Sequence, residues 1–164
     1  MPIALSYRHE TKVHYRRSFE EVVSRVFRSV SWKTSLMSVE GHRNTVVYVL
    51  DDDPSVLRSI GRLLVSEGFQ CCTFHDPDIF LESVMINAIP VVILDVWMEG
   101  VTGLEVQSKL QRVSPRTRVI IMTGRTDGGV RQTAMKMGAS AFLVKPFGDL
   151  ELINAIEVAL TAKS

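Results

Sequence analysis

The sequence predicts an α/β fold in which a parallel sheet of five strands is wound on both faces by helices. From Thr45 onward, short apolar runs alternate five times with amphipathic segments. The runs are apolar at consecutive positions, which is typical of strands that are buried on both faces. Because crossovers between parallel strands are right-handed, a doubly wound sheet is the simplest topology.

The expected strands are the apolar runs at residues 46–50, 69–74, 91–96, 119–122 and 141–144. Each run is short and rich in β-branched or aromatic residues, as strands in a covered sheet are. Polar side chains follow several of the runs directly. Those positions indicate where the strands end.

The segments between the strands have helical spacing and carry helix boundary signals. The first helix is expected to begin at Pro54, with Asp53 as its N-cap, and to stop at Gly68. The second opens at Asp76, which is suited to capping it. The other three are expected at residues 104–113, 130–137 and 150–160, with Asp149 as the N-cap of the last.

Composition and charge divide the 164 residues into two parts. A hydrophobic content of 46% is enough for a sizeable core, and the net charge of +1 does not indicate a polyanionic partner. Residues 1–44 carry a charge of +4, whereas residues 45–164 carry −3. We therefore expect a basic N-terminal extension over 1–44 and one domain over 45–164.

The extension contains a predicted amphipathic helix at about residues 18–32. Its apolar residues recur at helical spacing, and Ser18 with Glu21 forms a capping-box pattern. Three interpretations stay open: a docking helix for a protein or an anionic surface, a helix packed on the domain, or a segment upstream of a true start at Met37.

The remaining composition points to a cytoplasmic protein. Cys71 and Cys72 are adjacent, so their side chains diverge in an extended segment and are expected to be reduced thiols. No apolar run approaches the ~20 residues of a membrane span, and the first residues lack a contiguous signal-peptide core.

Polar residues follow four of the predicted strands, where the working site of a doubly wound sheet lies. They are Asp51, Asp52, Asp95, Thr123 and Lys145. Several carboxylates together can hold a hard cation such as Mg²⁺, and one of them can act as a nucleophile towards a phosphoryl group. An ammonium and a hydroxyl would then stabilise the transferred group. Taken singly, each acid is more often a solvated turn residue or a helix cap.

The motifs at these positions resemble response-regulator receiver domains of two-component systems. They are residues 47–53 (VYVLDDD), 91–95 (VVILD), 122–124 (MTG) and 145–147 (KPF). The resemblance covers roughly 45–160 and is closest to the FixJ-like subfamily, because of MTG, KPF and residues 134–139 (AMKMGA). It implies a flavodoxin-like sheet with strand order 2-1-3-4-5.

Carried over to this chain, the resemblance implies a phosphorylation switch rather than an enzyme, one that at most catalyses its own phosphorylation and dephosphorylation. Asp95 would accept a phosphoryl group from a histidine kinase or phosphotransfer protein. The implied Mg²⁺ ligands are Asp51, Asp52, Asp95 and the backbone carbonyl of Trp97. Thr123 and Lys145 would contact the phosphoryl group.

The resemblance also implies how the switch is read. Phe142 stands at the position of the switch aromatic, and the Lys145–Pro146 peptide is expected to be cis. The output surface would be the helix–strand–helix face at about 130–160, which would contact a downstream protein or a second copy of the chain. We expect no helix-turn-helix output domain, and nucleic-acid binding has little support. The alternatives are a truncated DNA-binding regulator or a degenerate receiver that acts as an unswitched binding module.

Two residues depart from the pattern of the family. Glu99 stands where the family commonly has proline, and it adds a negative charge near the predicted site. Trp97, together with Arg125, is placed to screen a phosphoryl group from water, although Trp97 is equally well explained as a packing residue. A small-substrate phosphatase is a weaker interpretation, because Trp97 occupies the position of its second acid. The sequence shows no histidine metal site and no Gly-rich nucleotide loop.

Overall fold

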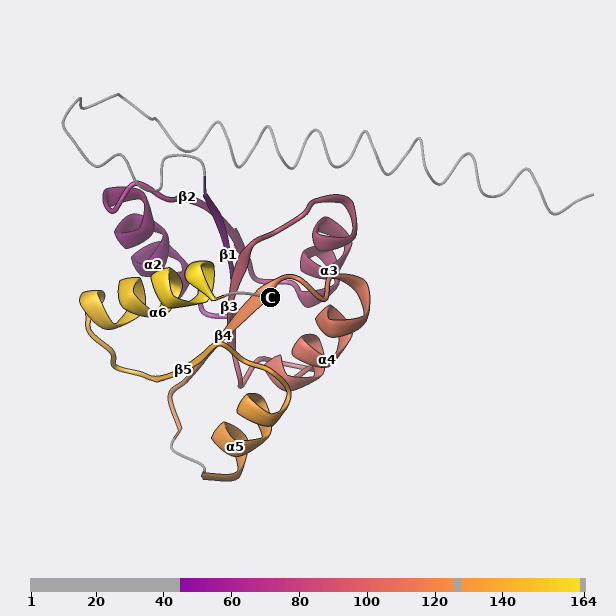
Figure 1. Ribbon diagram of the computed structural model, residues 1–164. Helices are drawn as coiled ribbons and strands as arrows, with labels where there is room; N and C mark the ends of the chain where they lie inside the picture. Colours follow the sequence, from indigo (N-terminus) through magenta and orange to yellow (C-terminus); the bar gives the residue numbers. More distant parts are fainter. Residues whose placement is uncertain (1–44, 126–127, 163–164) are drawn as a thin grey trace, which may run out of the picture. The chain divides into compact units, whose positions relative to one another are not determined.

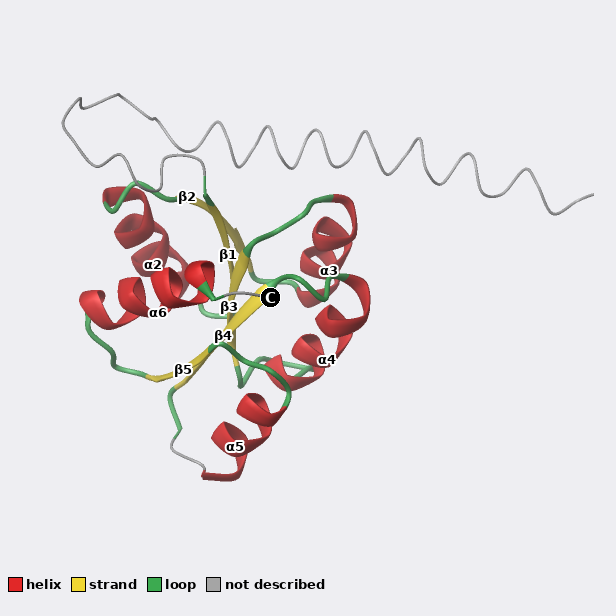
Figure 2. Cartoon of the chain, viewed as in Figure 1, coloured by secondary structure: helices red, strands yellow, loops and turns green. Residues whose placement is uncertain are grey.

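The structure, a computed structural model, describes residues 45–125 and 128–162, in which five strands alternate with five helices (Figures 1 and 2). The strands are β1 (Val46–Leu50), β2 (Gln70–Phe74), β3 (Val91–Asp95), β4 (Arg118–Thr123) and β5 (Ala141–Val144). The helices are α2 (Pro54–Ser66), α3 (Pro77–Ile86), α4 (Gly103–Val113), α5 (Gly128–Lys136) and α6 (Asp149–Thr161). The predicted bounds agree within two residues. The predictions for 1–44, including the helix at 18–32 and the start at Met37, lie outside the described residues.

The strands form one parallel sheet in the order β2-β1-β3-β4-β5, as predicted. The order reverses between β1 and β3, which are neighbours in the sheet although β2 lies between them in the sequence. Such a reversal opens a crevice beyond the carboxyl ends of the two strands. The fold therefore directs attention to the residues that follow β1 and β3.

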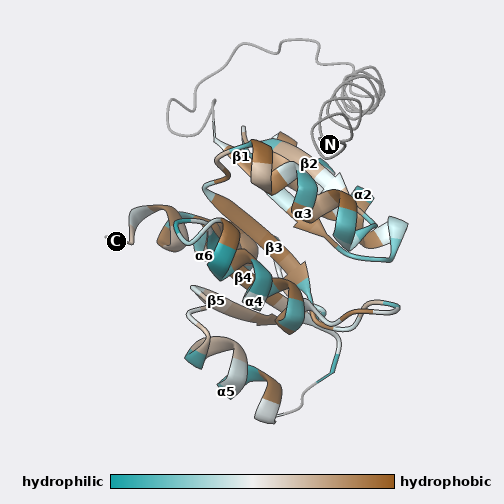
Figure 3. Ribbon diagram, turned by 90° about the vertical axis from the view of Figure 1, so that its right-hand side faces the viewer, coloured by the Kyte–Doolittle hydropathy of each residue, from teal (hydrophilic) through white to brown (hydrophobic). Residues whose placement is uncertain are grey.

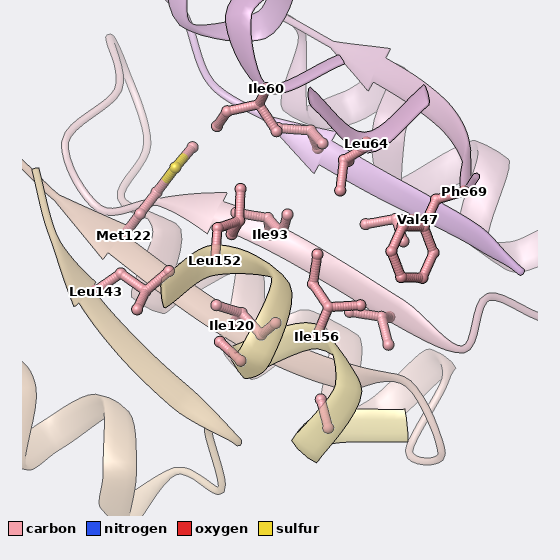
Figure 4. Packing of buried hydrophobic residues seen from close by; sticks show 14 of the residues in the cluster. Val47, Ile60, Leu64, Phe69, Ile93, Ile120, Met122, Leu143, Leu152 and Ile156 are labelled. Carbon is pink, nitrogen blue, oxygen red and sulfur yellow. The ribbon is translucent and has the colours of Figure 1, made fainter. Parts of the chain in front are cut away.

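Each face of the sheet is covered by its own set of helices, with α2 and α6 on one side and α3, α4 and α5 on the other (Figure 1). Alternate residues of β1 serve the two cores: Val47 and Val49 pack under α2 and α6, while Tyr48 and Leu50 pack under α3 and α4. Figure 4 shows the first of these cores. The apolar character of β3 along its length in Figure 3 follows from this double burial.

The helix N-termini confirm two predicted caps and correct one. Asp53 accepts a hydrogen bond from the Ser55 amide, and Asp76 caps α3. The prediction for Asp149 was wrong: it is the first residue of α6, and Gly148 is the N-cap, without a side-chain hydrogen bond. An acidic side chain in the first helical turn is still favourable, because it faces the positive end of the helix dipole. In the sequence, this position is hard to distinguish from the cap.

Helix α5 is attached to α4 by amide side chains. Among the residues of α5, only Ala134 is buried. The fully buried Gln107 of α4 donates from Nε2 to the carbonyls of Ala134 and Met137, at 3.1 Å each, and Gln111 Nε2 also donates to Met137. These carbonyls lie at the end of α5, where the usual helical donors run out. The Ala134 carbonyl also accepts from the Ala139 amide at 3.0 Å. The C-terminal end of α5 is therefore fixed by a neighbouring helix. None of the described helices is long and apolar enough to cross a membrane.

Candidate functional site: a buried carboxylate pair and its lysine

Lys145 joins the ends of three strands. Its Nζ donates to Oδ2 of Asp51, just after β1, at 2.6 Å, and to Oδ1 of Asp95, at the end of β3, at 2.7 Å. The two carboxylate side chains are 2% and 7% exposed, and the lysine side chain is 23% exposed. Two buried negative charges thus share one ammonium. The ammonium offsets part of the free-energy cost of burying the two acids.

The charge state of the group follows from burial and pairing. Burial raises the pKa of Asp95 above its ordinary value, and the nearby Asp51 adds to this, while the Lys145 ammonium opposes it. Burial by itself lowers the pKa of Lys145, but its hydrogen bonds and attraction to the two carboxylates outweigh burial and raise it. Lys145 is therefore a cation at neutral pH.

The second oxygen of Asp95 is held by the loop that follows β3. Oδ2 accepts a hydrogen bond of 2.6 Å from the backbone amide of Trp97. With Lys145 on Oδ1, both oxygens are fixed, so the carboxylate has one orientation. A nucleophile that is held in this way needs little reorganisation before it reacts.

The same loop folds back tightly onto β3. Trp97 and Thr102 form an isolated antiparallel bridge, and the amide of Gly103 donates to the Val96 carbonyl at 2.9 Å. A Cβ at Gly103 would lie only 2.1 Å from the backbone oxygen of Asp95. Helix α4 can therefore begin this close to Asp95 only because residue 103 is glycine. Thr102 and Glu105 form the capping box that starts the helix there.

Asp52 stands beside this group on the exposed side. Its Oδ2 accepts a hydrogen bond of 3.0 Å from the backbone amide of Glu99, which lies in the loop after β3. The two residues line a groove of about 970 Å³. The ionisable residues along the groove are Asp52, His75, Asp76, Asp78, Glu99, Glu105 and Lys109. The groove beside Asp52 is thus predominantly acidic.

Thr123 is brought to the same edge but faces a different partner. The Thr123 hydroxyl is buried, donates to the Arg125 carbonyl and accepts from the Arg125 amide, both at 3.2 Å. The Arg125 guanidinium lies 5.2 Å from the centre of the Trp97 ring. Phe142 is partly buried, with the Arg131 guanidinium 5.6 Å from its ring centre. The Lys145–Pro146 peptide is cis, as predicted.

The donor set is suited to Mg²⁺. Asp51 and Asp95 offer buried carboxylate oxygens, both of which accept a hydrogen bond from Lys145 Nζ. Asp52 adds an exposed carboxylate on the loop beside them. Within 45–125 and 128–162, no three acidic, histidine or cysteine side chains gather as a ready metal cluster. Mg²⁺ commonly uses only one or two carboxylates and keeps several waters, so these residues fit it without such a cluster.

The sequence of the chain also matches a known family. A sequence model described as "Response regulator receiver domain" matches residues 47–157. The chain belongs to the response-regulator receiver family. Receiver domains are the phosphorylation-dependent signalling domains of two-component systems, and not enzymes in the usual sense.

Curated relatives of this receiver are longer than the chain. It is 37% identical to response regulator protein TodT of Pseudomonas putida over 118 residues, which is 72% of this chain and 52% of TodT. It is 36% identical to transcriptional regulatory protein FixJ of Bradyrhizobium diazoefficiens over 124 residues, or 76% of this chain and 58% of FixJ. The chain thus spans about half the length of these relatives.

Solved receivers share the fold over most of their length. The chain is 29% identical to FixJ-N, whose structure superposes with a TM-score of 0.68. The match covers 73% of this chain and 96% of FixJ-N. The beryllofluoride-activated NtrC4 receiver domain dimer is 30% identical, also with a TM-score of 0.68, over 70% of this chain and 95% of that one. The predicted flavodoxin-like strand order is therefore confirmed by both the sheet and its relatives.

The sequence located the strand-end residues but missed the groups that hold them. It placed Asp51, Asp95 and Lys145 on one edge, and the structure joins all three by hydrogen bonds. The Glu99 amide on Asp52 was not foreseen, because backbone amides leave no signal in a residue pattern. Gly103 was also missed, although a glycine just before a helix would have been a usable signal.

Proposed function

We propose that this receiver is a signalling switch of the FixJ-like type, in which Asp95 accepts a phosphoryl group from a histidine kinase or phosphotransfer protein. The observation that carries the proposal is the position of Asp95, a buried carboxylate fixed between the Lys145 ammonium and the Trp97 amide. Asp51 and Asp52 would hold Mg²⁺ together with Asp95 and the Trp97 carbonyl. The ion would neutralise charge on the phosphoryl oxygens as the group is transferred.

In the transfer, an Asp95 oxygen attacks phosphorus, the bond between phosphorus and the donor nitrogen breaks, and the electron pair leaves with the donor histidine. The product carries roughly −1.5 to −2 charges where Asp95 carried one. Lys145 then exchanges its bond to Asp95 Oδ1 for one to a phosphoryl oxygen. Its ammonium already lies 2.7 Å from Asp95 Oδ1, so the new negative charge forms beside an existing cation.

The switch begins at Thr123. Its hydroxyl donates to the Arg125 carbonyl, so it has to leave that carbonyl before it can donate to the phosphoryl group. Phe142 turns inward as Thr123 moves, and the altered face around α5, β5 and α6 contacts a downstream protein or a second copy of the chain. This proposal places the protein in the cytoplasm, where its kinase partners transfer phosphate.

A second candidate is a receiver that controls a DNA-binding output, as a piece of a longer regulator. It is favoured by the length of the relatives, since this chain spans about half of FixJ, which is named a transcriptional regulatory protein. A salt-dependent shift of DNA by the present chain would favour DNA contact within these residues. No shift would show that these residues do not bind DNA by themselves, and the second candidate would then require a DNA-binding part outside them.

The proposal is tested by intact-mass analysis after incubation with Mg²⁺ and a small-molecule phosphodonor. We expect a single phosphoryl adduct on the parent, loss of the adduct in Asp95→Ala, and loss on chelation of Mg²⁺. Asp53→Ala is the matched control, because Asp53 is an exposed helix cap next to the site and its replacement should leave labelling intact. An adduct on Asp95→Ala would show that another residue accepts the phosphoryl group. No adduct on the parent, under conditions that label another receiver, would indicate a degenerate receiver.

Trp97 and Arg125 are expected to slow the loss of phosphate. The Trp97 amide holds Asp95 and the Arg125 guanidinium lies over the Trp97 ring, so we expect the pair to limit the approach of water to a phosphoryl group on Asp95. Trp97→Ala should dephosphorylate several times faster than the parent, measured by the decay of the adduct after the donor is removed. Trp97→Phe is the control that keeps an aromatic ring. Equal decay of parent and Trp97→Ala would assign Trp97 to packing alone.

A further inference from the structure

We infer that the backbone amide of Glu99 is a positioning group for the metal site, acting through Asp52. This inference rests on the proposed function, in which Asp52 is a Mg²⁺ ligand. The amide holds one oxygen of the carboxylate and leaves the other for the ion. It also ties the loop after β3 to the residue that follows β1, so that metal binding and loop position depend on each other.

The geometry supports a specific contact rather than chance proximity. Glu99 and Asp52 are 47 residues apart in the sequence, and their hydrogen bond of 3.0 Å joins two loops that follow neighbouring strands. The Asp52 side chain is exposed, so without this donor it would be free to turn into solvent. Met98, the residue before Glu99, is buried and anchors the loop from below.

The loop after β3 holds one oxygen of Asp95 and one oxygen of Asp52 through its backbone amides. Two residues after Asp95, the Trp97 amide holds Asp95 Oδ2, and two residues further on, the Glu99 amide holds Asp52 Oδ2. A single short segment thus orients two of the three acids. Groups that hold a metal ligand in place typically change metal affinity by 10–100-fold when they are lost.

Residue 99 makes this effect separable into two parts. Its side chain adds a negative charge to the groove, and its amide donates the hydrogen bond. Proline, which the family commonly has here, removes both, because it has no N–H. Glutamine removes only the charge. The difference between the two variants therefore measures the amide.

The experiment is calorimetric titration of the full chain with Mg²⁺, for the parent, Glu99→Gln and Glu99→Pro, at low and high salt. Glu99→Gln should weaken binding only a few-fold at low salt and hardly at all at high salt, because exposed charges are screened. Glu99→Pro should bind about tenfold more weakly than Glu99→Gln at both salt concentrations. Equal affinities for the two variants would overturn the inference while leaving Mg²⁺ binding established. A parent that binds no Mg²⁺ would overturn the metal site of the proposed function as well.

A second measurement avoids the risk that proline distorts the loop. Hydrogen exchange of the Glu99 amide, followed by NMR, should be several-fold slower in the parent than in Asp52→Ala. The variant lacks the carboxylate that accepts the hydrogen bond of this amide. It should slow further in the parent at saturating Mg²⁺, since the ion fixes the carboxylate that accepts the bond. Equal exchange rates in the parent and in Asp52→Ala would contradict the inference, whatever the proline variant does.

Discussion

Replacing Gly103 by alanine is expected to lower the free energy of unfolding by about 3 kcal/mol, the upper part of the range for overpacking. The added Cβ would lie 2.1 Å from the backbone oxygen of Asp95, and this contact is with main chain that cannot rotate away. Relief requires that the start of α4 move off the end of β3. The Trp97 amide would move with it, so the variant should also lose phosphoacceptor activity.

Urea unfolding of Gly103→Ala and of Gly61→Ala provides the measurement and its matched control. Gly61 lies inside α2, and a Cβ there would meet only side-chain atoms at 3.7 Å or beyond. Because alanine is the better helix former, Gly61→Ala should be neutral or stabilise by up to about 1 kcal/mol. Similar midpoints for the two variants would contradict the close approach at Gly103.

Replacing Lys145 by methionine is expected to destabilise the protein by about 3 kcal/mol at neutral pH, near the lower end for a broken buried pair because the lysine is partly exposed. Methionine fills a similar volume but leaves Asp51 and Asp95 as two buried carboxylates without a cation. The pKa of Asp95, already raised by burial, should rise further, since the Lys145 contribution that lowers it is gone. Lys145→Arg keeps the charge and should lose much less stability.

The pH dependence of the Lys145→Met effect has a definite sign. A carboxyl group whose pKa is raised by folding binds its proton more tightly in the folded state, so stability falls as pH rises from the unfolded pKa, near 3.9, through the folded one. The deficit of the variant should therefore be largest at neutral pH and shrink on acidification. At high pH it should shrink again, because the parent loses the contribution of Lys145 as pH rises through the raised pKa of that lysine.

Mg²⁺ adds a diagnostic to the same comparison. An ion that binds between the unpaired carboxylates would replace part of the missing positive charge and stabilise the folded state by mass action. Urea unfolding of Lys145→Met should therefore respond more strongly to added Mg²⁺ than that of the parent. A variant that unfolds like the parent at pH 7, with or without Mg²⁺, would show that the lysine does not balance the buried acids.

The sheet was predictable because its signals are local. A covered parallel strand is apolar at consecutive positions, and Val46–Leu50 and Ala141–Val144 have the bounds that this pattern gave. The caps at Asp53 and Asp76 are equally local. The prediction that Asp149 is the N-cap was wrong because an acidic residue is favourable both at the N-cap and one position later. Only the backbone angles distinguish the two positions.

The site was predictable in its members but not in all of its contacts. Strand order alone brings Asp51, Asp95 and Lys145 to one edge. The path of the loop after β3 depends on the close approach at Gly103. The hydrogen bonds of the Trp97 and Glu99 amides could therefore not be predicted from the sequence. The same holds for Thr123, whose hydroxyl partner is set by the rotamer of one side chain and not by its position.

The hydrogen bonds from Gln107 hold α5 at its C-terminal end. Its last carbonyls are held by Gln107 of α4, whereas among its own residues only Ala134 is buried. A force applied at the Gly128 end would therefore turn the helix about this attachment. Val130, which packs against the core, and Arg131, which lies over the Phe142 ring, would move with that end. Replacing Gln107 would free the other end of the helix, so the same force would shift the whole of α5.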